Sequence, residues 1–138
     1  MERLRESLHR ILRHGKGELG KAFYARFFEA CPQARSFFDG VDLDVQANVL
    51  VNALHVVVSH ACHRFPATEA YLKILGHRHH QRSIPAGMYP QFFGAMLQVL
   101  EEFHGGSWEP ELAGEWRQAF ELTGAAMAAG HQDGQLCY

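Results

Sequence analysis

Hydrophobic residues recur at intervals of three and four positions along almost the whole chain, the spacing that brings side chains onto one face of an α-helix. No short run of alternating hydrophobic and polar residues lies between two turn signals, as a hairpin of strands would require. Glycine or proline stands at most boundaries between the periodic segments. The pattern therefore predicts an all-α protein with six main helices and one short one.

The first half of the chain predicts three main helices. The first ends at the sequence HGKG and has its apolar positions at Leu4, Leu8, Ile11 and Leu12. The second runs from about residue 18 to residue 30 and is stopped by Pro32, after which PQARSFF has room for one short helical turn. The third begins where Asp42 or Asp44 can accept hydrogen bonds from free backbone amides, and it continues to about residue 60. Its predicted core positions are Val45, Val49, Leu50, Ala53, Val56 and Val57.

The second half predicts three further helices. Thr68 is the expected cap of the fourth, which ends before Pro85. The fifth runs from about residue 87 to residue 103, and its inward face is formed by Tyr89, Phe92, Phe93, Met96, Val99, Leu100 and Phe103. Ser107 is the expected cap of the sixth helix, with Pro110 in its first turn. The core positions of this helix are Leu112, Trp116, Phe120 and Thr123, and the tail from about Gly130 is expected to fray.

With 138 residues, 47% of them hydrophobic and 20% charged, the chain has the composition of an ordinary globular protein, and we expect one domain over residues 1–138. A net charge of -2 at pH 7 gives no general attraction to nucleic acid or to anionic membranes. The N-terminal segment lacks the apolar stretch of a signal peptide, so a cytoplasmic protein is expected. Three widely spaced cysteines predict reduced thiols: Cys31, Cys62 and Cys137.

His79 stands out among the ten histidines of the chain. It shares a helical face with Leu72 and Leu75, whereas His77 and His80 are turned away from this stripe. An imidazole on an apolar face is either a core histidine with hydrogen-bonded nitrogens or a metal ligand, and the spacing leaves both open. Two pairs of histidines three residues apart are candidates for a surface metal, although such pairs are usually adventitious without a third ligand. These pairs are His60 with His63 and His77 with His80.

Five segments occur in a characteristic order: FYARFFEACPQARSFF, QANVL, LGHRHHQRSI, MYPQFF and EWRQAF. In this order the chain resembles the bacterial single-domain globins, close to the haem domain of flavohaemoglobins and to Vitreoscilla-type haemoglobins. The resemblance runs from Leu4 to about Ala129. It implies a globin fold of the three-over-three type, with helices A, B, C, E, F, G and H, and a haem b cofactor. In that family a phenylalanine follows the helix C proline by six residues, as Phe38 follows Pro32 here.

The resemblance implies a role for each matching residue. His79 falls at the place of the proximal ligand of the haem iron, and Phe38 at the place of the phenylalanine that packs on the haem. Tyr24 and Gln46 fall at the places of the distal tyrosine and glutamine, which polarise a bound gas. The other matching positions are Leu50, Arg78, Ile84, Tyr89 and Trp116. Because a porphyrin needs an apolar slot, two further residues on inward helical faces are expected to contact it: Leu75 and Phe92.

The chain departs from this family at one position of the proximal side. Flavohaemoglobins join a glutamate near the end of helix H to the helix G tyrosine and, through it, to the proximal histidine, whereas the corresponding place here holds His131. A histidine carries no fixed negative charge, so the expected transfer of electron density toward the iron is in question. The chain also ends at Tyr138, which leaves no room for flavin and nicotinamide domains, so redox turnover is expected to need a separate reductase.

Four functions follow as hypotheses. The first is reversible haem-based binding of dioxygen, with nitric oxide and carbon monoxide as further ligands. The second is an enzyme, a nitric oxide dioxygenase that depends on a separate reductase as partner. The third is a gas sensor or interaction module, and the fourth is a haem-free helical bundle with surface zinc. The expected oligomeric state is a monomer or a homodimer.

Overall fold

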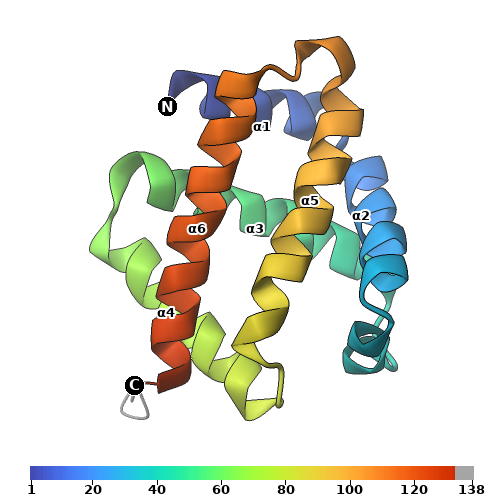
Figure 1. The fold of residues 1–138 in the computed structure, drawn as a ribbon, viewed down its shortest axis with the longest axis vertical. Coiled ribbons are helices and arrows are strands. Elements are labelled where there is room, and N and C mark those ends of the chain that lie inside the picture. The colour runs from blue at the N-terminus through green and yellow to red at the C-terminus, as the bar shows by residue number, and fades with distance from the viewer. Residues whose placement is uncertain (133–138) are drawn as a thin grey trace.

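The computed structural model describes residues 1–132, without the side chains of Lys16 and Gln132, and this range contains helices and no strand (Figure 1). The all-α prediction is confirmed. Six α-helices are joined by three short 3₁₀-helices in the order α1 (Glu2–His14), α2 (Lys16–Ala30), η1 (Pro32–Phe38), α3 (Leu43–His63), α4 (Pro66–Gln81), η2 (Ala86–Met88), α5 (Tyr89–His104), η3 (Gly105–Ser107) and α6 (Pro110–Gln132).

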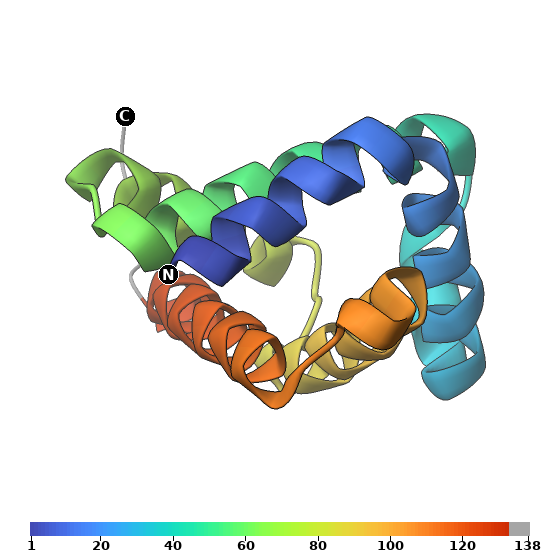
Figure 2. The ribbon, with the colours of Figure 1, turned by 90° about the horizontal axis from the view of Figure 1, so that it is seen from above.

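The helices form two packed groups, and α3 and α6 belong to both. In the first group α2 packs against α3 and α5, and α1 lies across α3 and α6 (Figures 1 and 2). The crossing of α2 and α3 is close because Gly20 has no side chain, and a Cβ atom there would lie 2.5 Å from the Cβ of Ala47. This contact sets the point along α2 and α3 at which the two helices cross.

Helix α4 lies along the C-terminal half of α6, packs mainly against it and contacts α3 only lightly (Figure 1). Two glycines allow the close approach of the two backbones. A Cβ atom on Gly76 of α4 would lie 2.0 Å from the carbonyl oxygen of Met127, and one on Gly130 of α6 would lie 2.0 Å from the carbonyl oxygen of Lys73. A larger residue at either glycine would therefore force α4 and α6 apart.

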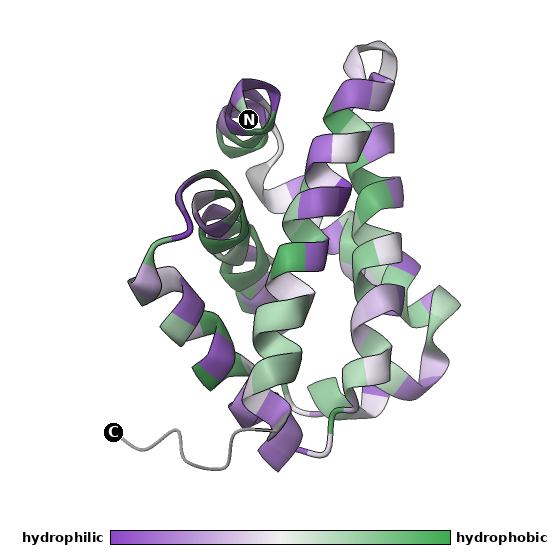
Figure 3. Cartoon of the chain, turned by 60° about the vertical axis from the view of Figure 1, so that its left-hand side comes forward, coloured by the Kyte–Doolittle hydropathy of each residue, from purple (hydrophilic) through white to green (hydrophobic). Residues whose placement is uncertain are grey.

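The buried side chains gather in two clusters. The larger cluster is built from α1, α2, α3, α5 and α6 and includes Phe23, Val51, Met96 and Trp116, all fully buried. The smaller one holds Leu72, Tyr89, Ala126 and Met127, where α4 and α5 meet the end of α6. Hydrophobic and hydrophilic residues alternate along the helices that surround both clusters (Figure 3). The ring of Phe93 packs against both clusters and connects them.

The buried face of α3 differs from the predicted one. Leu50 and Val57 are buried as predicted, and Ala53 and Val56 are partly buried, but the side chains of Val45 and Val49 are 58% and 50% exposed. The prediction failed because α3 is apolar around most of its circumference, so that contact with α2 and α6, and not the sequence pattern, selects the inward face. By length and mean hydropathy alone α3 would qualify as a membrane span, a property it shares with core helices of folded proteins.

The ends of several helices also test the sequence pattern. Asp42 caps α3 as predicted, with its carboxylate accepting hydrogen bonds from the amides of Asp44 and Val45. The predicted caps of the fourth and sixth helices are wrong. Helix α4 begins at Pro66, so Thr68 lies inside its first turn and donates to the carbonyl of Phe65.

Ser107 does not cap the sixth helix either, since it closes η3 by donating to the carbonyl of His104 while α6 begins at Pro110. In both places proline sets the first helical residue, because its fixed φ suits that position and its missing N–H costs nothing there. The predicted fraying at Gly130 is not seen at that residue, since α6 continues to Gln132. The rest of the predicted tail lies outside the described residues.

Candidate functional site

His79 lies in the last turn of α4 and is partly buried. Its backbone carbonyl accepts a hydrogen bond of 2.9 Å from the amide of Ile84, which holds the chain leaving the helix close to the histidine. Burial, His131 and Arg82 together lower the pKa of His79 from its ordinary 6.5 to about 4. The imidazole is therefore neutral at pH 7, the form in which histidine binds metals.

A chain of hydrogen bonds connects His79 to the end of α6 through the first residue of α5. The Tyr89 hydroxyl lies 3.4 Å from Nδ1 of His79 and 2.5 Å from Nε2 of His131. Burial raises the pKa of Tyr89 to about 12, so its hydroxyl keeps its proton. Tyr89 can then donate to His131 while its oxygen accepts from Nδ1–H of His79, which leaves Nε2 of His79 available to a ligand.

His131 is the position at which sequence analysis expected an acid and found a histidine. Burial and the neighbouring His80 and His77 lower the pKa of His131, so the neutral form is favoured. The ring of His80 lies beside it, with 5.3 Å between the ring centroids. His131 therefore accepts the hydrogen bond from Tyr89 as a neutral group, and the relay contains no carboxylate among the described residues.

Tyr24 and Phe38 form the core of a second group of predicted residues. The Tyr24 ring is 4% exposed and meets the Phe38 ring edge to face, with 5.3 Å between the centroids. Burial raises the pKa of the Tyr24 hydroxyl, and a hydrogen bond with the side chain of Gln46 partly offsets this. Leu50 follows Gln46 by one helical turn and is 5% exposed. The structure thus brings all four of these predicted residues together where α2, η1 and α3 meet.

The remaining predicted residues divide between the two core clusters. Phe92 and Ile84 are partly buried and pack against the larger cluster, which also contains Tyr24 and Leu50. Leu75 packs against the smaller cluster, which contains Tyr89. Trp116 is fully buried in the larger cluster, whereas Arg78 is exposed on α4 and joins neither cluster.

Trp116 belongs to a buried polar network that sequence analysis did not find. Its Nε1–H donates to Oγ of Ser7 at 3.0 Å, and the same oxygen lies 2.6 Å from Nε2 of His104. Burial and Arg10 lower the pKa of His104 to about 4, so this ring is neutral and accepts the Ser7 hydrogen. The three residues come from α6, α1 and α5, and no local signal in the sequence connects segments so far apart.

The chemistry of these groups fits a haem. A neutral imidazole with one nitrogen held by a hydrogen bond is a good axial ligand for haem iron. Three apolar side chains that are only partly buried lie on α4, on α5 or in the connection between them, namely Leu75, Phe92 and Ile84. Tyr89, the hydrogen-bond partner of His79, belongs to the smaller cluster, whereas Tyr24 and Leu50 belong to the larger one. Two further buried side-chain atoms have no hydrogen-bond partner within residues 1–132, namely Nδ1 of His77 and Oγ1 of Thr123.

Comparisons with known proteins agree with the fold described above. The family model described as Globin matches residues 21–127 of the chain. A curated relative is the anaerobic nitrite reductase HBII of Casuarina glauca, 26% identical over 127 residues, which covers 80% of this chain and 78% of that protein. Among solved structures, the haemoglobin of the shortfin mako, Isurus oxyrinchus, superposes with a TM-score of 0.77 at 17% identity, covering 93% of this chain and 94% of that one.

Proposed function

The chain belongs to the globin family and has the globin fold predicted from its sequence, and from this premise we propose that it binds haem b through His79 and uses the haem to bind dioxygen reversibly. The observation that carries the proposal is His79 itself, a neutral imidazole whose Nδ1 faces Tyr89. When bound, the haem iron supplies a coordination position for a diatomic gas. Dioxygen, nitric oxide and carbon monoxide are the proposed small ligands.

The protein side chains then determine how the haem is held and oriented. Phe38, Leu50, Leu75, Ile84 and Phe92 are the proposed apolar contacts of the haem, and the exposed Arg78 is the proposed partner of a haem propionate. Tyr89 orients the His79 ring by accepting the hydrogen of Nδ1. The hydrogen bond between Tyr89 and His79 supports the proposal independently of the comparisons.

On the other side, Tyr24 is the proposed hydrogen-bond donor to the gas. Its raised pKa keeps the hydroxyl protonated, and the Gln46 amide contacts the same hydroxyl. A hydrogen bond to a strongly polarised oxygen contributes roughly 1.5 to 3 kcal/mol, which corresponds to about ten- to hundredfold in the rate of ligand release. Tyr24 and Gln46 therefore favour slow release of dioxygen.

The central experiment compares the optical spectra of the ferric, ferrous and oxygenated forms for the wild type, His79→Ala and His80→Ala. The neighbouring His80 is exposed and serves as the matched control. Loss of haem retention, or of a five-coordinate ferrous spectrum, is expected for His79→Ala alone. Unchanged spectra for His79→Ala, or no Soret band in the wild type, would refute the proposal.

The distal assignment has its own test, in which stopped-flow measurements follow dioxygen release from Tyr24→Phe and from the control Tyr71→Phe. Tyr71 lies on α4 and its side chain is 49% exposed, so its hydroxyl is in solvent. Tyr24→Phe should release dioxygen about ten- to hundredfold faster, and Tyr71→Phe at the wild-type rate. An unchanged rate for Tyr24→Phe would show that Tyr24 is not the donor.

A second candidate is enzymatic chemistry on nitrogen oxides, favoured by the name of the curated relative, a nitrite reductase. In its dioxygenase form, one nitric oxide, one dioxygen and one electron give one nitrate, and a separate reductase supplies the electron. Rapid mixing of the oxygenated protein with nitric oxide, followed by repeated cycles with added reductase, tests this form. Replacing nitric oxide with nitrite under anaerobic conditions tests the reductive form. Oxidation in a single cycle without recycling favours the gas-binding function.

A further inference from the structure

The end of the molecule that carries His79 has a one-sided distribution of charge. Residues 70–100 contain three basic side chains, Lys73, Arg78 and Arg82, and no acidic one, so all fifteen Asp and Glu residues of the chain lie elsewhere. The part of α6 that packs along the second half of α4, from residue 122 to residue 132, contains no Asp or Glu either (Figure 1). In a chain of net charge -2, the described residues of this end therefore carry positive charge alone.

The basic side chains stand beside a surface with little side-chain bulk. Arg78 and Arg82 are exposed and lie one helical turn apart, so they share one side of the end of α4. The ion pairs found in residues 1–132 include neither of them. The exposed residues of the connection that follows are small and uncharged, namely Ser83, Pro85 and Gly87. We call the surface formed by these five residues the α4–α5 face.

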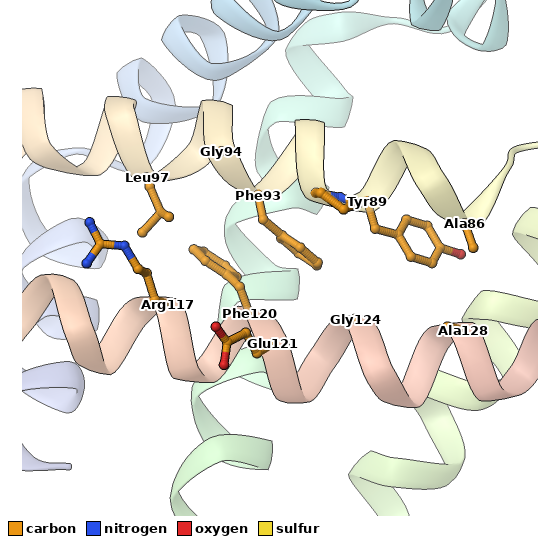
Figure 4. A pocket seen from close by; sticks show the side chains of 11 residues that line it. Ala86, Tyr89, Phe93, Gly94, Leu97, Arg117, Phe120, Glu121, Gly124 and Ala128 are labelled. Carbon is orange, nitrogen blue, oxygen red and sulfur yellow. The ribbon is translucent and has the colours of Figure 1, made fainter.

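The α4–α5 face differs in charge from the groove of about 450 Å³ between α5 and α6. That groove exposes one side chain of each sign, Arg117 and Glu121 (Figure 4). A surface with both signs favours neither sign in a partner, whereas the α4–α5 face attracts negative charge.

Arg82 lies where the two halves of the candidate site approach each other. Its Nη2 donates to the carbonyl oxygen of Phe37 in η1 at 3.4 Å, and its charge is one of the groups that lower the pKa of His79. The guanidinium therefore lies between the helix end that carries His79 and the segment that carries Phe38, two proposed contacts of the haem. The next residue, Ser83, has a φ of 63°, a left-handed conformation that favours glycine, and such strain is common at functional sites.

We propose that the α4–α5 face is the docking surface for an acidic electron-carrier protein that reduces the haem. This rests on the proposed function, since a haem bound through His79 must be in the ferrous state to bind dioxygen. The flavin or iron–sulfur group of the carrier loses one electron and the haem gains it, and no bond forms or breaks. Arg82 pairs with carboxylates of the carrier, Arg78 and Lys73 add to the attraction, and the small residues let the carrier approach closely.

Charge complementarity distinguishes this occupant from other anionic surfaces. A nucleic acid or an anionic membrane presents negative charge over a wide area, so it would also meet the fifteen acidic side chains of the rest of the chain. An electron carrier needs only a small and transient contact, with less than about 1,200 Å² of buried surface. Carboxylates limited to such an area can face Arg82 without meeting the acidic parts of this chain.

The test is anaerobic stopped-flow reduction of the ferric holoprotein by a reduced plant-type ferredoxin, an acidic iron–sulfur protein of about -400 mV. The second-order rate constant is measured at several salt concentrations. Arg82→Glu should lower it about tenfold at low salt, and the difference should vanish at high salt, where the attraction is screened. Arg82→Lys keeps the charge and should stay within about twofold of the wild type. Arg13→Glu makes the same change of charge on an exposed residue of α1 and should have no effect.

Docking itself is measured separately from reduction, by nuclear magnetic resonance titration of the isotope-labelled protein with oxidised ferredoxin. Amide signals of residues 78–87 should shift in the wild type and not in Arg82→Glu. A protein that retains no haem would refute the proposed function, and the titration would still decide whether the face binds the carrier.

Three results would overturn the proposal: equal rate constants for the wild type and Arg82→Glu at low salt, a difference between them that persists at high salt, or amide shifts that lie outside the α4–α5 face. Vesicles of phosphatidylcholine and phosphatidylserine supply the competing surface. If they sediment the wild type but not Arg82→Glu, while ferredoxin shifts no amide signal, the face would belong to a membrane and the proposal would be wrong.

Discussion

The contact between α4 and α6 makes a quantitative prediction at Gly76. In the substitution Gly76→Ala, the added methyl group would lie 2.0 Å from the carbonyl oxygen of Met127, well inside van der Waals contact. The obstacle is the backbone of α6, which cannot rotate aside as a side chain can. The two helices must therefore move apart along the interface that holds α4.

The expected magnitude combines two opposing effects. Alanine is a better helix former than glycine by about 1 kcal/mol, which alone would stabilise α4. Overpacking a tight contact costs about 1 to 3 kcal/mol, and the upper end applies here because a backbone atom is in the way. The free energy of unfolding should therefore fall by about 2 kcal/mol in Gly76→Ala.

Gly114 on α6 provides the matched control, since it is exposed, lies inside a helix and would place a Cβ atom in open space. Gly114→Ala should raise the free energy of unfolding by about 0.5 to 1 kcal/mol, so the same substitution has opposite signs at the two sites. Urea unfolding followed by far-ultraviolet circular dichroism measures both variants. If Gly76→Ala were as stable as the wild type, the close approach of α4 and α6 would not be needed and the reasoning would be refuted.

Two further predictions concern the buried network of Ser7, His104 and Trp116. Because the folded state holds the pKa of His104 at about 4, below its ordinary 6.5, the unfolded chain binds more protons between these values. This contribution to stability, at most about 3 kcal/mol, is complete above pH 6.5 and is lost as the pH falls toward 4. In His104→Asn, the free energy of unfolding plotted against pH should lose this part of its slope across that range. Ser7→Ala leaves the buried N–H of Trp116 without its acceptor and should cost about 2 kcal/mol in urea unfolding. The exposed Ser36→Ala, as control, should cost under about 0.5 kcal/mol.

The helices and the residues of the candidate site were predictable for different reasons. Helical periodicity was strong enough to give all six helices, because most of them bury one clear face. His79 could be singled out because its neighbours Leu72 and Leu75 define that face. No local sequence pattern marks Tyr24 and Gln46 as distal residues. They were identified only because the order of the motifs resembles that of a known family.

The predictions failed where two local sequence signals competed or where contacts between segments far apart in the sequence decide the structure. Val45 and Val49 were assigned to the core because α3 has apolar residues on nearly every side, and only the packing against α2 and α6 decides which side is buried. Thr68 has the chemistry of a cap, but the nearby Pro66 starts the helix earlier. The groove between α5 and α6 depends on how far apart two helices pack, a quantity that periodicity does not encode.

The division of the core into two clusters has a consequence for the protein before its cofactor arrives. The smaller cluster holds four buried residues and is joined to the larger one through Phe93, so α4 is held mainly by α6 and only lightly by the rest of the core. Amide hydrogens of α4 should exchange with solvent faster than those of α2 or α5 in the apoprotein. A cofactor that binds between the clusters must also supply the free energy that orders α4. The measured binding free energy of the cofactor is therefore the free energy of its contacts less the free-energy cost of ordering α4.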